Sequence, residues 1–273
     1  MKLGKMRRSR RSAVFVLTGT LLAATAGAQQ QAQSGEVKKV PTPGIPSTGF
    51  AGLDQYRSSR VPMLLDDYGQ LARYRTANEE LLKAGPVQGR VVFFGDSITD
   101  NWKLEQYFPG KPYVNRGIGG QTTPQMLVRF RQDAIALQPK AVVILAGTND
   151  IAGNTGPIRI EDIEADLATM AELAKAHGIA AVFASILPVH NYTPKAADFF
   201  AQRPGARILE LNRWLKEYCS KNGMVYLDYF SAVVDDKGLL RKELAEDGLH
   251  PNDAGYKIMA PLAEAAIAEA ATR

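Results

Sequence analysis

The sequence predicts a three-layer α/β domain in which helices cover both faces of a central parallel sheet of five strands. From Val91 onward, short apolar runs of strand length alternate with amphipathic stretches of helical length. This alternation is the pattern of a parallel sheet with helices on its faces. Gly178 and Gly223 follow two of the expected helices, where a helix C-terminus favours glycine. Asn252-Asp253 stands ahead of the last helix, where a side-chain cap is favoured.

The expected elements follow one another in βα order after an N-terminal helix. That first helix covers Asp67 to Lys83, and Gly85-Pro86 closes it. The expected strands lie near Val91–Phe94, Tyr113–Asn115, Ala141–Ala146, Ala180–Ser185 and Met224–Asp228. The later helices are expected near Pro124–Leu137, Ile160–His177, Ala206–Asn222 and Asp253–Ala271. Residues 61–273 are thus expected to form one domain, with residues 61–90 as an N-terminal helical extension.

Residues 1–28 have the pattern of an export signal. Six basic residues stand in the first eleven positions, an apolar run covers Ala13 to Ala24, and Ala26-Gly27-Ala28 supplies a small-residue cleavage site. Because the apolar run is shorter than the ~20 residues that span a bilayer, cleavage near Ala28 is favoured over a membrane anchor. The mature protein is therefore expected in the periplasm or outside the cell. Arg10-Arg11 leaves both the general and the twin-arginine export routes open.

The mature chain is expected to begin with a flexible linker and to carry little net charge. Residues 29–60 are rich in Gln, Gly, Pro and Ser, and they hold too little apolar surface to offset the entropy of ordering them. Residues 1–28 carry six basic and no acidic side chains, so cleavage changes the formal net charge from +5 to −1. The alkaline isoelectric point is therefore no argument for nucleic acid as a partner. No later stretch is long and apolar enough to enter a membrane stably.

Polar and glycine-rich segments follow four of the five expected strands. In open α/β sheets the ligand lies in the crevice outside the carboxyl ends of the strands, so these segments are expected to meet. They are Gly95-Asp96-Ser97 after the first strand, Asn115 to Thr122 after the second, Gly147 to Asp150 after the third, and Asp247 to Asn252 beyond the fifth. Each alone is also ordinary turn or capping sequence. Four of them at one edge of a sheet indicate a site.

Together the four segments supply the groups that acyl transfer requires. Ser97 is the candidate nucleophile, His250 the candidate base, and Asp247 the candidate group that orients the base. The backbone N–H groups of Ser97 and Gly120 and the side-chain amide of Asn149 are candidate donors to the oxyanion.

The same four segments resemble the signature blocks of the SGNH (GDSL) hydrolases. The second block, Asn115 to Gly120 with Thr122, is most similar to the branch that contains the platelet-activating-factor acetylhydrolase catalytic subunits and related bacterial esterases. The resemblance spans Val91 to the C-terminus and implies a flavodoxin-like fold without a metal or another cofactor. It also implies Ser97 as nucleophile, Gly120 and Asn149 as oxyanion donors, and the Asp247–His250 pair as the rest of a catalytic triad.

Four further residues are candidates for substrate binding. Trp102 follows the nucleophile closely, although packing in the core explains it equally well. Gln121 stands where many members of the family have Asp, which bears on the shape of the substrate more than on the chemistry. His190 and Tyr192 follow the fourth strand at the same edge, and the loop 191–205 is a candidate lid or rim.

The favoured function is a secreted serine esterase that removes short acyl groups, such as acetate, from carbohydrate or other small polar esters. A lysophospholipid substrate stays open as an alternative. A second alternative is a ligand-binding module of the same fold without catalytic activity, but such a module does not need all five candidate catalytic residues. A dinucleotide site is disfavoured because Gly117-x-Gly119-x-x-Thr122 lacks the third glycine and follows the second strand instead of the first.

Overall fold

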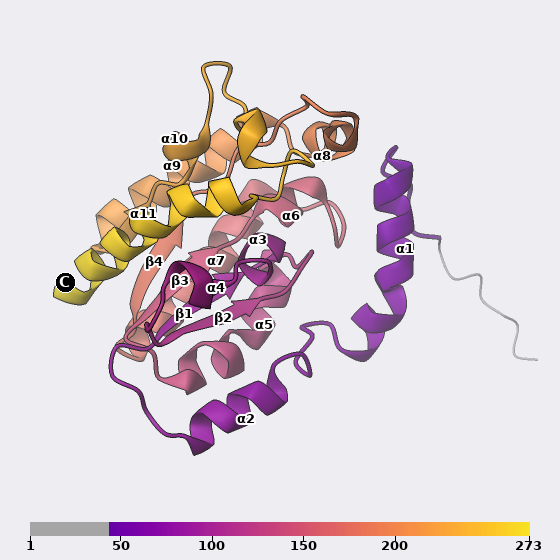
Figure 1. Cartoon of the computed structure of the whole chain (residues 1–273). Helices are drawn as coiled ribbons and strands as arrows, with labels where there is room; N and C mark the ends of the chain where they lie inside the picture. The colour runs from indigo at the N-terminus through magenta and orange to yellow at the C-terminus, as the bar shows by residue number, and fades with distance from the viewer. Residues whose placement is uncertain (1–43) are drawn as a thin grey trace, which may run out of the picture. The chain divides into compact units, whose positions relative to one another are not determined.

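The computed structural model describes residues 44–273, and it contains the five-stranded parallel sheet that the sequence predicts (Figure 1). The strands are β1 (Val91–Gly95), β2 (Tyr113–Gly117), β3 (Ala141–Leu145), β4 (Ala180–Ala184) and β5 (Val225–Leu227). Their order in the sheet is β2-β1-β3-β4-β5, and all neighbouring strands are parallel. The order reverses at β1 and β3, which in a doubly wound sheet places the ligand crevice at the carboxyl ends of these two strands.

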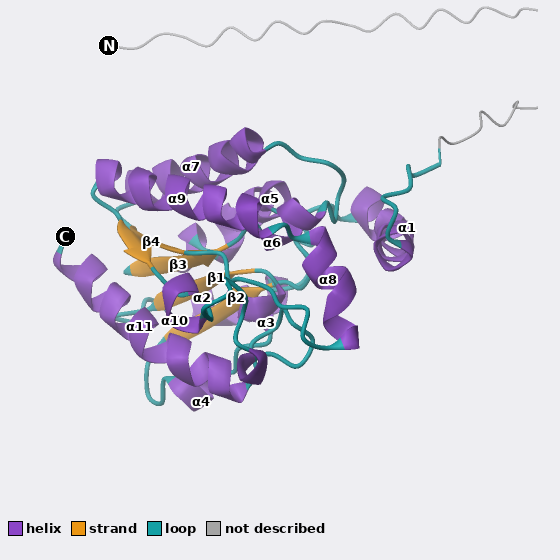
Figure 2. Cartoon of the chain, turned by 90° about the horizontal axis from the view of Figure 1, so that it is seen from above, coloured by secondary structure: helices purple, strands orange, loops and turns teal. Residues whose placement is uncertain are grey.

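Helices cover both faces of this sheet, as Figure 2 shows. The α-helices are α1 (Ala51–Asp66), α2 (Arg75–Lys83), α3 (Ser97–Asp100), α4 (Leu104–Tyr107), α5 (Thr123–Asp133), α6 (Thr148–Ala152), α7 (Ile160–Ala176), α8 (Ala197–Gln202), α9 (Gly205–Asn222), α10 (Phe230–Val233) and α11 (Asp253–Thr272). Short 3₁₀ helices form at η1 (Ile135–Leu137), η2 (Pro194–Ala196) and η3 (Lys242–Leu244). None of the described helices has the length and apolar character that crossing a membrane requires.

The two faces of the sheet bury two separate apolar cores. Side chains alternate along a strand, so Val92 and Phe94 of β1 pack into the core that α5, α7 and α9 cover. Phe93 packs on the opposite side, in the core that contains the inner face of α11. All five residues of β1 are buried. Because both of its faces are covered, β1 has a continuous apolar run instead of an alternating pattern.

The predicted strands and the four long helices are confirmed. Each strand lies within two residues of its expected bounds. The expected helix over residues 124–137 is divided into α5 and η1, and the chain leaves η1 through Gln138 in a left-handed conformation with a φ of 51°.

The expected organisation of the N-terminal region is wrong in two places. Residues 51–60 belong to α1 instead of a linker, and they are part of the compact unit that begins at Gly44. The backbone N–H of Thr48 donates to the Asp54 carboxylate at 2.7 Å, and Leu53 is buried, so a local hydrogen bond and packing order this segment. The expected export signal over residues 1–28 and residues 29–43 of the expected linker lie outside the described residues.

The expected helix over residues 67–83 is present only from Arg75. The Asp67 carboxylate accepts hydrogen bonds from the backbone N–H groups of Leu71 at 2.8 Å and Ala72 at 3.0 Å. A side chain that bonds to nearby backbone in this way competes with the hydrogen bonds of a helix. Gln70 has a φ of 53°, which also interrupts helical geometry.

One buried arginine joins the carboxyl ends of β1 and β2. Arg129 of α5 is fully buried and donates to the carbonyl of Gly95 at 2.9 Å and to that of Arg116 at 2.8 Å. Its Nε donates to the side-chain oxygen of Gln121 at 2.6 Å, and Asp133 supplies the counter-charge at 3.3 Å. These contacts fix the ends of the two strands that lead into the first two predicted segments of the site.

A buried carboxyl joins α6 to the start of α5. Oδ1 of Asp150 accepts from the backbone N–H of Thr123 at 2.8 Å and from its hydroxyl at 2.7 Å. Burial raises the pKa of Asp150 from 3.8 to about 7, against the lowering effect of these hydrogen bonds. The folded protein therefore binds this proton more tightly than the unfolded chain does. The stability that this difference contributes is complete below about pH 4 and is lost as the pH rises to about 7.

We expect Asp150→Asn to remove this pH dependence, because the amide resembles the protonated carboxyl and does not titrate. The free energy of unfolding of the variant relative to wild type should rise between about pH 5 and about pH 8. Urea unfolding followed by circular dichroism at both pH values measures the difference. Asp236→Asn, which alters an exposed carboxylate, serves as the control and should show no such trend. A difference between D150N and wild type that is the same at both pH values would contradict the assignment.

Candidate active site

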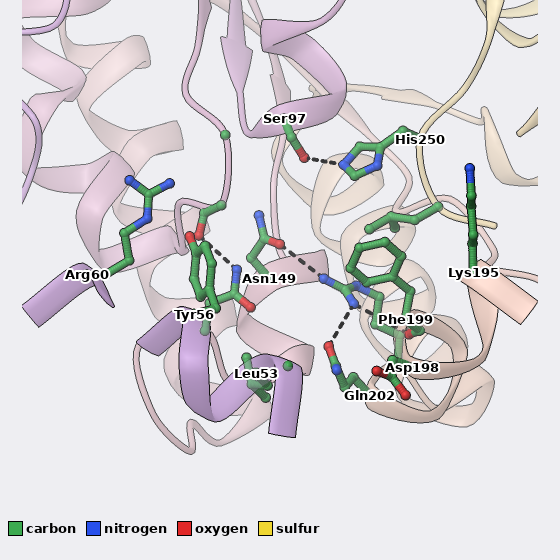
Figure 3. Close-up of a pocket in the computed structure, with 16 residues that line it drawn as sticks. Leu53, Tyr56, Arg60, Ser97, Asn149, Lys195, Asp198, Phe199, Gln202 and His250 are labelled. Atoms are coloured by element: carbon green, nitrogen blue, oxygen red, sulfur yellow. Dashed lines mark hydrogen bonds between the residues drawn. The ribbon is translucent and has the colours of Figure 1, made fainter. Parts of the chain in front are cut away.

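The structure brings Ser97, His250 and Asp247 into one hydrogen-bonded chain. Ser97 is the first residue of α3, and only Asp96 separates it from Gly95 at the end of β1. Its Oγ lies 2.8 Å from Nε2 of His250 (Figure 3), and Nδ1 of His250 lies 2.6 Å from Oδ2 of Asp247. These are hydrogen-bond distances at both ring nitrogens. The arrangement has the order nucleophile, base and orienting carboxylate.

A buried carboxyl forms the turn that presents Ser97. Asp96 is the N-cap of α3, and its Oδ1 accepts from the backbone N–H of Ile98 at 2.9 Å. Burial raises the pKa of Asp96 to about 6, in opposition to this hydrogen bond and to the nearby positive charges. The cap fixes the turn between β1 and α3, so the Ser97 hydroxyl stands at the rim of the sheet.

The loop before α11 holds the base and its carboxylate as a unit. Oδ1 of Asp247 accepts from the backbone N–H groups of Leu249 at 3.0 Å and His250 at 2.8 Å. Gly248 has a φ of 82°, and a side chain there would collide with the carbonyl of His190. The backbone N–H of His190 donates to the Gly248 carbonyl at 3.0 Å. The loop therefore requires glycine at position 248, and the hydrogen bond from His190 holds it in place.

The charge on Asp247 determines which ring nitrogen of His250 carries a proton. Burial alone would raise the pKa of Asp247, but hydrogen bonds from the His250 ring and from the backbone outweigh burial and hold that pKa well below its usual range. The ionised carboxylate only accepts hydrogen bonds, so Nδ1 of His250 is the donor. In the neutral ring Nε2 is then free to accept the hydrogen of the Ser97 hydroxyl.

Gly120 and Asn149 lie beside Ser97 in the same pocket. Gly120 has a φ of 80°, and a Cβ atom there would lie 1.9 Å from the hydroxyl oxygen of Tyr56, so glycine is required. Nδ2 of Asn154 donates to the Gly120 carbonyl at 3.0 Å, and Nδ2 of Asn149 donates to the Gln121 carbonyl at 3.0 Å. An amide nitrogen has two hydrogens. The second hydrogen of Asn149 has no partner in the described part of the chain and is available to a ligand.

The pocket is a cavity of about 510 Å³ that opens beside Ser97. One wall comes from α1 and the opposite wall from the segment that contains η2 and α8. The side chains of these two walls are Leu53, Tyr56, Arg60, Lys195, Asp198, Phe199 and Gln202 (Figure 3). The lining combines an apolar surface with charged and hydroxyl groups, which is typical of a site for a small polar ligand.

The contribution of α1 to this pocket was not predicted from the sequence. Leu53, Tyr56 and Arg60 all line it, although the sequence analysis placed them in a linker. Their spacing of three and four residues puts them on one face of a helix. That periodicity is the signal that could have identified the helix against the polar composition around it. Arg203, which follows α8, is a second pocket residue that the sequence analysis missed.

None of the four expected substrate-binding side chains lines this pocket. Trp102 is 2% exposed and stacks on Tyr256 in the core, with 5.0 Å between the ring centroids. Gln121 is buried and donates to the carbonyl of Gly69. His190 is buried, and its Nε2 lies 2.7 Å from the carbonyl oxygen of Ala245, so it supports the loop that carries the base.

Tyr192 also turns away from the pocket, since its hydroxyl donates to Asp235 at 2.5 Å. The loop that contains Tyr192, residues 191–205, does form part of the pocket rim. Residues 191–205 supply Lys195, Asp198, Phe199 and Arg203 to the pocket wall. The rim therefore lies in the expected segment and includes Phe199, whereas Tyr192 is not part of the pocket wall.

Comparisons with known proteins agree with this geometry. The sequence profile of the GDSL-like Lipase/Acylhydrolase family matches residues 93–258, which include every residue of the Ser97, His250 and Asp247 chain. The crystal structure of a GDSL-like lipase from Bacteroides thetaiotaomicron is 38% identical, with a TM-score of 0.68, and the match covers 74% of this chain and 99% of that one.

Two curated relatives have a lower sequence identity than this crystal structure, and one of them matches over a shorter part of the chain. The uncharacterized lipoprotein YqeF of Bacillus subtilis is 30% identical over 151 residues, which are 47% of this chain and 62% of its own length. The acetylxylan esterase of Geobacillus stearothermophilus is 25% identical over 205 residues, which are 63% of this chain and 90% of its own length. With the family profile and the fold in agreement, this chain belongs to the GDSL-like lipase/acylhydrolase family of ester-hydrolysing enzymes.

Proposed function

We propose that this protein is a serine esterase that hydrolyses short-chain acyl esters of polar alcohols through an acyl-enzyme on Ser97. The observation that carries the proposal is the pair of contacts from Ser97 to His250 at 2.8 Å and from His250 to Asp247 at 2.6 Å. Ser97 and His250 line a cavity to which Gly120 and Asn149 also contribute. A nucleophile, an oriented base and amide donors within one cavity are the set that acyl transfer needs.

In the proposed reaction, Nε2 of His250 takes the Ser97 proton as Oγ forms a bond to the ester carbonyl carbon. The carbonyl oxygen becomes an oxyanion, and the N–H groups of Ser97 and Gly120 and the amide of Asn149 donate hydrogen bonds to it. The alcohol leaves with the proton from His250. Water then loses a proton to the same ring and attacks the acyl carbon. The bond to Oγ breaks, and the ring returns the proton to Oγ as the acid leaves, which restores Ser97. Asp247 stays ionised and stabilises the charged ring throughout.

The composition of the pocket wall supports a small acyl group on a polar alcohol. Leu53, Phe199 and Leu249 provide apolar surface for the acyl group, while Tyr56, Arg60 and Lys195 present a hydroxyl and two cations. Such groups are suited to hydrogen bonds with a hydroxyl-rich alcohol. The curated relative named as an acetylxylan esterase is consistent with an acetylated carbohydrate as the substrate class.

We expect a panel of aryl esters to give the highest kcat/KM for acetate, with a steady fall as the acyl chain lengthens. Acetylated sugars should be hydrolysed and lysophospholipid should not. Ser97→Ala should lower kcat by on the order of 10⁴-fold or more on every substrate, because it removes the nucleophile. Ser231→Ala, which alters an exposed serine on α10, is the matched control and should retain wild-type rates.

Each part of the proposal fails on a different result. A preference for long acyl chains would displace the short-chain assignment and favour lysophospholipid. Near-normal activity of S97A would remove Ser97 as nucleophile. Failure of the wild-type protein on every ester would favour a binding module without catalytic activity.

We further propose that the protein is exported and that its signal is cleaved near Ala28. The basic and apolar pattern of residues 1–28 supports this proposal, and the relative in Bacillus subtilis is named as a lipoprotein. Expression in a bacterial host, followed by cell fractionation and N-terminal sequencing, tests it. The expected product lies outside the cytoplasm and begins close to Gln29. Recovery of the intact N-terminus in the cytoplasm would contradict export.

A further inference from the structure

Arg203 is a buried cation at the pocket that the proposed reaction does not use. The residue is 2% exposed and caps the C-terminus of α8. Within residues 44–273 it forms no salt bridge, in contrast to Arg129, which has Asp133 beside it. An unpaired buried charge is costly unless hydrogen bonds compensate for it. The partners of its guanidinium therefore indicate what it does.

The guanidinium bonds to both residues that begin α6. Nε of Arg203 donates to the Thr148 hydroxyl at 3.0 Å. Nη2 donates to Oδ1 of Asn149 at 3.2 Å. Nη1 lies 3.4 Å from the Phe199 carbonyl. Most of the donors of Arg203 are thus committed to protein groups rather than to the open part of the pocket.

These contacts fix which way the Asn149 amide points. A guanidinium only donates hydrogen bonds, so the atom that faces Arg203 must be the amide oxygen. The amide nitrogen then faces the Gln121 carbonyl at 3.0 Å, which only accepts. A flipped amide would place N–H against a donor and oxygen against oxygen. Both ends of the amide are therefore specified, and the second N–H is held on the side of the pocket.

We propose that Arg203 is a positioning residue of the oxyanion site, which holds the Asn149 amide with an N–H toward the developing oxyanion and strengthens it as a donor. The inference rests on the proposed function, in which Asn149 contacts that oxyanion. A charged hydrogen bond to Oδ1 draws electron density from the amide and makes its N–H a better donor.

The same side chain connects the oxyanion site with the base. The guanidinium carbon of Arg203 lies 5.3 Å from the centroid of the Phe199 ring. The Phe199 ring meets His250 edge-on at 5.9 Å between centroids. Burial lowers the pKa of Arg203 to about 10, so the cation persists at neutral pH. The Phe199 ring therefore lies near both Arg203 and His250, while the polar contacts of Arg203 with the oxyanion site go to Thr148 and Asn149.

A double-mutant cycle with Asn149→Ala and Arg203→Met tests this inference on an aryl acetate. N149A should lower kcat by about 10² to 10³-fold, as for the loss of one oxyanion donor. R203M should lower kcat by roughly 10 to 100-fold with KM within about twofold of wild type, and R203K should recover part of that loss. Because Arg203 acts through Asn149, the double variant should be no slower than N149A by more than about threefold.

Arg207→Met is the matched control for the loss of a guanidinium. Arg207 is one turn further along the chain on α9, donates to the Ile158 carbonyl at 3.1 Å and does not contact Asn149. Its kcat should stay within about twofold of wild type. Multiplicative losses in the double variant would overturn the inference. So would a loss that appears in KM alone, because it would make Arg203 a substrate-binding group.

A second measurement keeps the inference separate from the proposed function and from a loss of folding. In ¹⁵N spectra the side-chain amide of Asn149, identified by its absence in N149A, should exchange slowly with water in wild type and rapidly in R203M. Unchanged exchange in a folded R203M protein would overturn the inference. If S97A were active while this exchange still depended on Arg203, the proposed function would fail and the positioning role would stand. Should R203M not fold, R203K carries both measurements, and wild-type kcat with unchanged exchange in R203K would then overturn the inference.

Discussion

The site depends on the way in which the buried guanidinium of Arg129 holds two strand ends together. It bonds to the carbonyls of Gly95 on β1 and Arg116 on β2, and to the side chain of Gln121 beyond β2. The chain turns toward Ser97 directly after Gly95, and the carbonyl of Gln121 receives the Asn149 amide. The relative positions of the candidate nucleophile and the candidate oxyanion donor thus follow from one charged group. Its burial is tolerable because Asp133 and several carbonyl oxygens surround it.

The pocket above these strand ends is completed by one helix inside the family match and one outside it. The family profile begins at residue 93, so α1 lies outside the matched residues, whereas α8 lies within them. The hydroxyl of Tyr56 on α1 reaches Gly120, and Phe199 on α8 reaches His250. The proposed catalytic residues thus lie at the sheet edge, and the side chains of α1 and α8 form the pocket walls around them. This division is common in α/β folds, where a rigid scaffold carries catalysis and its surroundings vary.

The sheet and the chain of Ser97, His250 and Asp247 were predictable because their signals are local. An apolar run that ends at Gly95 marks a strand end, and parallel strands bring such ends to one edge. The roles of Trp102 and His190 were not predictable, since an aromatic ring near a strand end packs in the core or lines a pocket according to tertiary contacts that no short pattern contains. Helix α1 was missed because polar composition outweighed a three-residue stripe. Arg203 gave no signal, as the partners that define its role, Thr148 and Asn149, lie more than fifty positions away.

The most direct test is to label the serine that would carry the acyl group with a fluorophosphonate. This reagent transfers one phosphonyl group to an activated serine and releases fluoride. Intact-mass spectrometry of the wild-type protein should show a single adduct, and peptide mapping should locate it on Ser97. The S97A variant should remain unmodified under the same conditions. An adduct on another residue, or equal modification of the variant, would contradict the assignment of Ser97 and with it the mechanism built on this site.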